Sequence, residues 1–180
     1  MNAMIWDYLM DKLGNAYGAA GLMGNLFAES GLHPNKLEYA HQKRLGYTSN
    51  TYTEAVDQGV YDNFVHDGAG YGLAQWTFRT RKEGLLSYAR SRGTSIGDLA
   101  MQLDYLWIEL NEEFPELLEL LRTAPDLSTA SDAVLTKFER PLDQGEAIKK
   151  QRTSYGQRYF NKYSGMIIWS IIRTTGLWSG

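Results

Sequence analysis

The chain has 180 residues, enough for one domain with a substantial hydrophobic core. Apolar residues make up 43% and charged residues 22%, which is typical of a globular protein and excludes a disordered one. The net charge of −3 argues against a nucleic-acid binder held by phosphate contacts. Because the chain has no cysteine, disulfides and thiolate chemistry are excluded.

Aromatic residues are abundant, with five tryptophans and twelve tyrosines. Side chains of this kind suit a surface that stacks on flat, weakly charged ligands such as sugar rings. Protein interfaces are also rich in aromatic residues, so composition leaves both alternatives open.

The first predicted element is a short amphipathic helix over residues 1–13. Its apolar residues recur at helical spacing: Met4, Ile5, Tyr8, Leu9 and Leu13. The acidic side chains within this stretch and the lack of a basic start argue against a secretory signal peptide. Gly14 ends the helix.

The central predicted helix covers residues 15–30. Asn15 is a good N-cap, Gly31 suits the position after the last helical residue, and Pro34 prevents continuation. Three glycines, at positions 18, 21 and 24, form a row on the side away from the apolar face. Each costs about 0.5–1 kcal/mol relative to alanine, so the row predicts close approach of another helix or of a ligand.

Glu29 lies at the edge of the apolar face and in the last turn of this helix. The negative end of the helix dipole and partial burial both disfavour an ionised carboxylate. A general acid that works near neutral pH needs such a preference for the protonated form. The alternative is an ordinary solvent-exposed surface glutamate.

Residues 37–71 lose the helical period and predict an irregular lobe. A two-stranded hairpin is expected there, with one strand near residues 45–53, which are β-branched, aromatic and polar. His33, His41 and His66 fall in or beside this lobe. Their spacing fits no metal-binding motif, so we expect neither a metal site nor a cofactor.

A glycine-rich block covers residues 68–76. It lacks the Gly-Lys-Ser/Thr of a phosphate loop. Its glycines allow a backbone to approach a ligand closely, with Gln75 and Trp76 behind them. The alternative is a tight turn whose Leu73 and Trp76 plug the core.

The remaining chain predicts scaffold helices. Thr80 and Glu83 form a capping box that opens a helix ending at Gly93, and Ser95 and Asp98 open the next. Further helices are expected at residues 115–121, from Ser128 or Ser131 to Phe138, and at 146–163 with Tyr155, Tyr159 and Tyr163 on one side as core or cleft wall. The apolar tail at residues 165–180 has no assigned role and is too short to span a bilayer.

Two blocks together carry a family resemblance. The stretch 25–34, Asn-Leu-Phe-Ala-Glu-Ser-Gly-Leu-His-Pro, and the stretch 70–77, Gly-Tyr-Gly-Leu-Ala-Gln-Trp-Thr, resemble the phage tail lysozyme family. The segment 138–141, Phe-Glu-Arg-Pro, resembles a later part of that family. More remotely, the chain is similar to goose-type lysozymes and soluble lytic transglycosylases. The resemblance covers residues 1–164 and implies a mainly helical, lysozyme-like catalytic domain with a small irregular or β-hairpin lobe.

The resemblance also implies an activity and site residues. Glu29 matches the catalytic acid, and Tyr71, Gln75 and Trp76 match residues that line the glycan groove. The implied reaction is cleavage of the β-1,4 bond between N-acetylmuramic acid and N-acetylglucosamine in peptidoglycan. The implied partners are peptidoglycan strands and other domains of a phage tail or wall hydrolase, at the virion or outside the cell at its wall.

The reaction outcome depends on a second carboxylate. Asp67 is the first candidate, followed by Asp62 and Asp57, and each could instead close an Asx-turn. The transglycosylase motif Ala-Tyr-Asn-x-Gly is missing, with only a remnant at Tyr155, so hydrolysis is favoured over transglycosylation. A non-catalytic peptidoglycan-binding module and a structural tail component are the alternatives from other classes.

Overall fold

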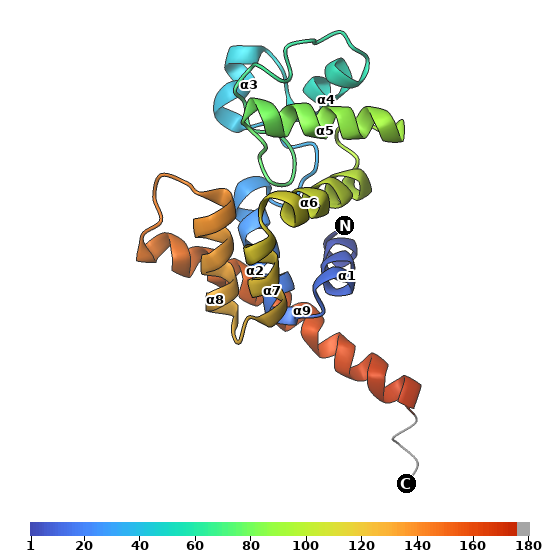
Figure 1. Cartoon of the computed structure of the whole chain (residues 1–180). Coiled ribbons are helices and arrows are strands. Elements are labelled where there is room, and N and C mark those ends of the chain that lie inside the picture. The colour runs from blue at the N-terminus through green and yellow to red at the C-terminus, as the bar shows by residue number, and fades with distance from the viewer. Residues whose placement is uncertain (176–180) are drawn as a thin grey trace. The chain divides into compact units, whose positions relative to one another are not determined.

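The structure is a computed structural model that describes the backbone of residues 1–175 and the side chains of residues 1–165 (Figure 1). The described chain is mainly helical, which confirms the predicted fold class. The helices are α1 (Asn2–Leu13), α2 (Ala16–Ser30), α3 (Tyr39–Leu45), α4 (Ser49–Asp57), α5 (Arg79–Arg92), α6 (Leu99–Glu113), α7 (Pro115–Thr123), α8 (Leu127–Val134), the π-helix η1 (Leu135–Glu139) and α9 (Glu146–Thr175).

The chain divides into two compact units. Unit 1 comprises Met1–Ala28 and Phe114–Gly180, and unit 2 comprises Glu29–Glu113. The expected tail at residues 165–180 begins inside α9, whose helical backbone runs to Thr175. The rest of that expectation lies outside the described residues.

The first helix forms as predicted. Its buried residues are Ile5, Trp6, Leu9 and Leu13, and Gly14 ends it with a left-handed φ of 67°. Trp6 stacks on Tyr163 of α9, with 5.5 Å between the ring centroids. The amphipathic pattern thus anchors α1 to the last helix of unit 1.

Asn15 fixes the start of α2 from both ends of its side-chain amide. Its Oδ1 accepts a hydrogen bond from the backbone N–H of Tyr17 at 2.9 Å, as an N-cap does. Its Nδ2 donates to the carbonyl oxygens of Arg122 and Ala124, both at 3.1 Å. The predicted N-cap is confirmed, and it also joins α2 to the end of α7.

The glycine row on α2 is the contact surface for three other helices of unit 1. A Cβ added at Gly18 would lie 2.0 Å from the carbonyl oxygen of Leu121 in α7. At Gly21 it would lie 2.8 Å from Cβ of Ala130 in α8. The helix-approach alternative for the row is therefore confirmed at these two positions.

The third glycine of the row packs against α9 in the same way. A Cβ added at Gly24 would lie 2.5 Å from the backbone nitrogen of Gly156. A Cβ added at Gly156 would lie 2.7 Å from the carbonyl oxygen of Ala20. Two glycines, one on each helix, therefore let α2 and α9 cross backbone to backbone.

Helix α8 begins earlier than predicted. Asp126, not Ser128 or Ser131, is its N-cap, and the Asp126 carboxylate accepts from the backbone N–H of Thr129 at 2.7 Å. Helices α7 and α9 begin at Pro115 and Glu146, as expected. In the tyrosine row on α9, Tyr159 and Tyr163 are buried, so they belong to the core of unit 1.

In unit 2, the predicted strand at residues 45–53 is wrong, because α3 and α4 occupy this part of the lobe. Thr48 caps α4, and Thr51 bonds back to the backbone N–H of Thr48 at 2.9 Å. This is a capping box with threonine in place of the usual glutamate or glutamine. Within residues 1–175, β-pairing is limited to isolated bridges.

The predicted capping box at Thr80 is also wrong. Helix α5 begins at Arg79, and its N-cap Phe78 makes no side-chain capping bond, whereas the predicted end at Gly93 is confirmed. Helix α6 begins at Leu99, later than predicted, because Asp98 and not Ser95 is its N-cap; the Asp98 carboxylate accepts from the backbone N–H of Met101 at 2.8 Å. None of the helices in the described part of the chain is long and apolar enough to cross a membrane.

Candidate functional site

Glu29 lies in the last turn of α2 and is half-buried. Gly31 and Leu32, which follow, both adopt left-handed backbone conformations, with φ of 64° and 63°. Gly31 ends the helix as predicted. A left-handed leucine is strained, and the complete burial of the Leu32 side chain offsets this strain. The backbone that follows the last turn of α2, two and three residues after Glu29, is therefore held in an uncommon but well-packed conformation.

The segment that follows Pro34 lies against the glycine-rich block within unit 2. Leu37 and Tyr71 form an antiparallel bridge. The backbone N–H of Glu38 donates to the carbonyl oxygen of Gly70 at 2.8 Å, and the Glu38 carboxylate accepts from the N–H of Gly70 at 2.9 Å. About forty residues of sequence separate the two motifs, and direct hydrogen bonds join the glycine-rich block to the segment that follows the first motif.

Gln75 supports the turn inside the glycine-rich block. Its backbone is left-handed, with φ of 46°. Its side-chain nitrogen donates to the carbonyl oxygens of Lys36 and Gly72 at 3.1 and 3.0 Å. The side chain is half-buried, so one surface of it stays open to solvent.

Tyr71 and Trp76 are completely buried. The Tyr71 hydroxyl lies 2.6 Å from the hydroxyl of Thr53, and burial raises the pKa of Tyr71. The indole N–H of Trp76 donates to Glu109 at 3.0 Å, and Arg81 forms a bidentate ion pair with the same carboxylate. These contacts favour the core-plug alternative over a direct place in a glycan groove.

Asp67 is the centre of a buried polar network. Its side chain is 0% exposed and forms an ion pair with Lys82, at 2.6 Å. The hydroxyls of Tyr52 and Tyr61 donate to Asp67 Oδ2 at 2.5 and 3.2 Å. The backbone N–H of Ala69 donates to Oδ1 at 2.9 Å, which closes an Asx-turn. The burial and the complete set of partners favour a structural role over the catalytic role expected from sequence.

Lys82 is the buried cation of that network. Its ammonium group donates to Asp67 and to the carbonyl oxygen of Ala69, and it lies 4.3 Å from the ring centroid of Phe64. Burial lowers the pKa of Lys82, against the raising effect of the Asp67 carboxylate. Because Asp67 and Ala69 immediately precede Gly70, the network fixes the entry to the glycine-rich block.

The other two candidate carboxylates differ from each other. Asp57 accepts from the hydroxyl of Ser95 at 2.5 Å and from the backbone N–H of Ile96 at 2.9 Å, which joins the end of α4 to the loop before α6. Asp62 is exposed. In the part of the chain that the structure describes, no group of three or more metal-ligating side chains is found.

Sequence reasoning missed three buried polar residues of unit 2, namely Lys82, Gln102 and Glu109. The signal for Lys82 is its spacing, because it stands three and seven residues before Leu85 and Ala89 on the buried face of α5. Gln102 and Glu109 likewise stand seven residues apart, on the buried face of α6. A polar residue in an apolar helical stripe is the pattern that would have identified them.

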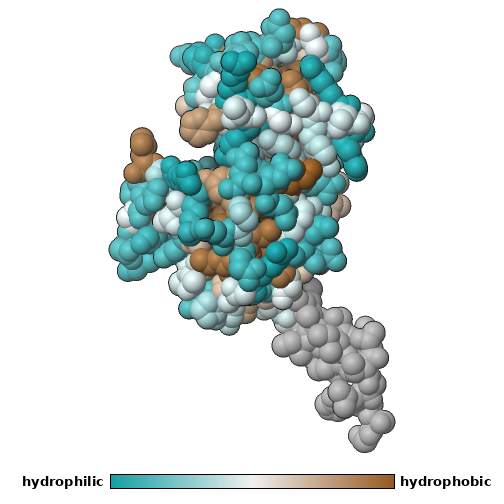
Figure 2. Space-filling view, in the orientation of Figure 1, coloured by the Kyte–Doolittle hydropathy of each residue, from teal (hydrophilic) through white to brown (hydrophobic). Residues whose placement is uncertain are grey.

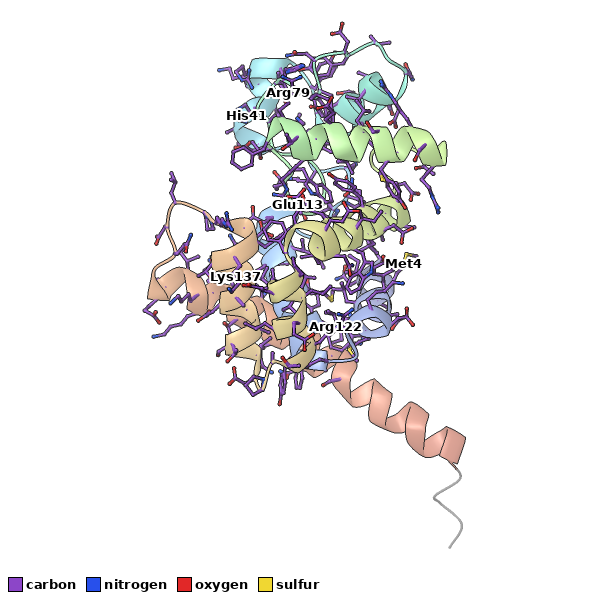
Figure 3. All side chains as sticks on the ribbon, viewed as in Figure 1. Met4, His41, Arg79, Glu113, Arg122 and Lys137 are labelled. Atoms are coloured by element: carbon purple, nitrogen blue, oxygen red, sulfur yellow. The ribbon has the colours of Figure 1, made fainter. Side chains whose placement is uncertain are left out.

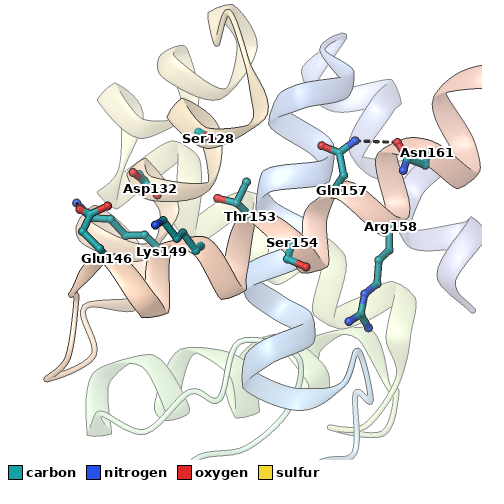
Figure 4. A pocket seen from close by; sticks show the side chains of 10 residues that line it. Ser128, Asp132, Glu146, Lys149, Thr153, Ser154, Gln157, Arg158 and Asn161 are labelled. Atoms are coloured by element: carbon teal, nitrogen blue, oxygen red, sulfur yellow. Dashed lines mark hydrogen bonds and ion pairs between the residues drawn. The ribbon is translucent and has the colours of Figure 1, made fainter.

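A groove of about 660 Å³ runs along α8 and α9 in unit 1 (Figure 4). Asp132, Glu146 and Lys149 line one end, and Gln157, Asn161 and Arg158 line the other. None of the site residues expected from sequence lines this groove.

The helical fold and the two joined motifs define a lysozyme-like protein. The sequence pattern of the phage tail lysozyme family matches residues 2–163, and the chain belongs to that family. The predicted family is thereby confirmed. Membership makes the chain a lysozyme-like peptidoglycan hydrolase, associated with a phage or acting on the cell wall. A search of curated proteins finds no match.

Proposed function

We propose that the protein is an N-acetylmuramidase that cleaves the β-1,4 bond between N-acetylmuramic acid and N-acetylglucosamine, with Glu29 as general acid. The observation that carries the proposal is the hydrogen-bonded junction between the segment after Glu29 and the glycine-rich block. It supports a single site formed by two motifs that are about forty residues apart in the sequence. Family membership supports the substrate, peptidoglycan.

In this mechanism, protonated Glu29 donates its proton to the glycosidic oxygen as the bond from that oxygen to C1 of N-acetylmuramic acid breaks. N-acetylglucosamine leaves with a free 4-hydroxyl. Water adds to C1, and its proton passes to the Glu29 carboxylate, which restores the acid. The net reaction consumes one water and creates a new reducing end on N-acetylmuramic acid.

The burial of Asp67 argues against the catalytic role that the sequence suggested for it. A carboxylate without solvent exposure and with four donors cannot contact the sugar or activate water at its surface. We therefore assign Asp67 a positioning role for the block that begins at Gly70. Gln75 remains the proposed substrate-binding residue of the block, because it alone among the three expected ones is partly open to solvent.

A second candidate function is lytic transglycosylation of the same bond, in which the substrate's own hydroxyl attacks C1. The burial of Asp67 favours it, because this reaction needs no second carboxylate. The remnant tyrosine of the missing motif, Tyr155, packs edge-on against Phe27 within unit 1, with 4.9 Å between the ring centroids.

The test is digestion of purified cell walls followed by mass spectrometry. Hydrolysis gives reducing-end muramic acid with the mass of one added water, whereas predominantly 1,6-anhydro products would establish transglycosylation. Glu29→Gln should reduce product release by about 10²–10⁴-fold, because the near-isosteric amide cannot donate the proton. Glu54→Gln, an exposed glutamate of the same unit, is the matched control and should keep native activity. Near-native lysis by Glu29→Gln would reject Glu29 as the acid.

A further inference from the structure

Two aromatic side chains beside the glycine-rich block are exposed, in contrast to Tyr71 and Trp76. Tyr39 is 81% exposed and Phe78 is 73% exposed. Large apolar surfaces in water cost free energy, so exposed aromatic rings at one place commonly mark a binding surface.

Tyr39 and Phe78 each directly follow a residue that lies against Gly70. Tyr39 follows Glu38, which exchanges two hydrogen bonds with Gly70. Phe78 follows Thr77, whose hydroxyl would lie 3.2 Å from a Cβ added at Gly70. The two rings therefore flank one glycine from two separate segments of unit 2.

Neither ring has a role in local folding. Tyr39 is the first residue of α3 and belongs to no buried cluster. Phe78 is the N-cap of α5, a position where serine, threonine, aspartate and asparagine are strongly preferred. A phenylalanine there forgoes the capping bond, so local stability does not explain its presence.

Each ring is accompanied by an exposed cation. Lys43 stands four residues after Tyr39 on α3, which places both on one face of the helix. Arg79 directly follows Phe78 and is exposed. Figure 3 labels Arg79 and His41 at this end of unit 2, and Figure 2 shows a small light-brown group of atoms among mostly hydrophilic ones on the left of this unit.

We propose that Tyr39 and Phe78 are stacking platforms for the sugar rings of a peptidoglycan strand, and that Lys43 and Arg79 bind the carboxylates this strand carries. The inference rests on the proposed function and adds to it the surface that selects the substrate. The apolar face of a sugar ring covers the aromatic ring, and the cations pair with the carboxylates of the stem peptides, or with the lactyl carboxylate of a muramic acid residue that carries no peptide. A neutral glycan such as chitin has sugar rings that can stack on Tyr39 and Phe78, but it has no carboxylates for the two cations.

The binding test uses the full chain with Glu29→Gln, so that the strand is not cut, and measures sedimentation with insoluble peptidoglycan. Tyr39→Ala and Phe78→Ala should each raise the dissociation constant about three- to tenfold. Val60→Ala removes an exposed apolar side chain elsewhere in unit 2 and should bind as the parent does. Tyr39→Phe keeps the ring and should recover the affinity that Tyr39→Ala loses. Lys43→Gln and Arg79→Gln should weaken binding to peptidoglycan, more so at low salt, and leave binding to chitin unchanged.

Phe78→Ser separates binding from folding. A serine N-cap should raise the unfolding midpoint of the protein, while the loss of the ring weakens binding to peptidoglycan. Unchanged binding by both alanine variants would overturn the inference, as would altered self-association without altered wall binding. The release of muropeptides by the protein with Glu29 intact reports on the proposed function separately, because it is read from products and not from binding.

Discussion

Gln102 donates a hydrogen bond from its side-chain nitrogen to the carbonyl oxygen of Pro34, at a distance of 2.6 Å. The same nitrogen donates to the carbonyl oxygen of Ile96 at 2.6 Å, and the side-chain oxygen accepts from the backbone N–H of Leu73 at 2.9 Å. The Gln102 side chain is completely buried. One amide from α6 therefore satisfies backbone groups of both lysozyme motifs and of the loop before α6.

Replacing Gln102 with methionine should be strongly destabilising. The substitution leaves up to three buried backbone groups without partners, at roughly 1–3 kcal/mol for each group that water does not reach. We expect a loss of several kcal/mol in urea unfolding. Gln58→Met changes an exposed glutamine of the same unit and is expected to stay within about 0.5 kcal/mol. A Gln102→Met protein of native stability would show that this amide does not join the motifs.

Replacing only one partner of the ion pair between Lys82 and Asp67 should lower the free energy of unfolding far more than replacing both partners. Lys82→Met leaves a buried carboxylate without its cation, for which losses of about 3–5 kcal/mol are typical. Lys82→Met combined with Asp67→Asn should be less destabilising than Lys82→Met alone, because the amide still accepts from Ala69 and carries no charge. A double-mutant cycle by chemical unfolding measures this coupling.

Asp67→Asn alone distinguishes a positioning residue from a catalytic one. In the positioning role, wall-lytic activity should fall only as far as the folded fraction falls, and cooling or a stabilising osmolyte should restore it. A well-folded Asp67→Asn protein with activity reduced a hundredfold or more would return Asp67 to the catalytic machinery.

The close crossing of α2 and α9 predicts opposite effects for two glycine substitutions. Gly24→Ala would place Cβ 2.5 Å from the backbone of Gly156, and overpacking against a backbone costs about 1–3 kcal/mol or more. Gly165→Ala, on α9 with no atom within 4 Å, should be neutral or stabilising by up to about 1 kcal/mol. Equal thermal midpoints for the two variants would contradict the backbone contact.

Alkaline pH should unfold the protein through the tyrosines around Asp67. Burial, with Asp67 nearby, raises the pKa of Tyr61 to about 12, and burial and the hydrogen bond to Asp67 raise the pKa of Tyr52 further. Because the folded-state pKa lies above the unfolded value of about 10, the folded protein holds these protons more tightly. For Tyr61 this contribution to stability is complete below about pH 10 and is lost as pH rises through the window from 10 to 12. For Tyr52, whose pKa is raised further, the loss continues above that window.

The measurement is unfolding free energy against pH, together with the absorbance of tyrosinate. Tyr52→Phe removes the most strongly shifted group, so its pH dependence above pH 10 should be shallower than that of the parent protein. Tyrosinate formation by all tyrosines near pH 10 in a still-folded protein would contradict the prediction.

Much of the helical scaffold could be predicted, because its signals are local. Asn15, Gly31 and Gly93 are cap residues whose preference depends on backbone conformation within one turn. The strand expected at residues 45–53 failed because β-branched residues there serve as a threonine capping box, and short segments with mixed propensity are decided by such contacts. Likewise, Phe78 opens α5 against its own propensity, which no local rule anticipates.

The candidate site was predicted in part. The two motifs and their order were visible in the sequence, but the burial of Tyr71 and Trp76 was not, since a core plug and a sugar platform have the same residue types. Asp67 had the same ambiguity, and its partner Lys82 comes from a helix fifteen residues further on. Burial and long-range pairing are properties of the packed chain, and a single sequence does not encode them in any local pattern.

The glycine row has a consequence for how this helix can vary. Because three glycines press against the backbones of other helices in unit 1, α2 cannot rotate about its own axis without a clash. The direction in which Glu29 leaves the helix axis is thus fixed by its distance in sequence from Gly24, because each residue adds a rotation of about 100° and a rise of about 1.5 Å. A single-residue insertion between them would swing the carboxylate by about a quarter turn, although every residue of the motif would still be present. The spacing from Gly24 to Glu29 is therefore as much a part of the proposed site as Glu29 itself.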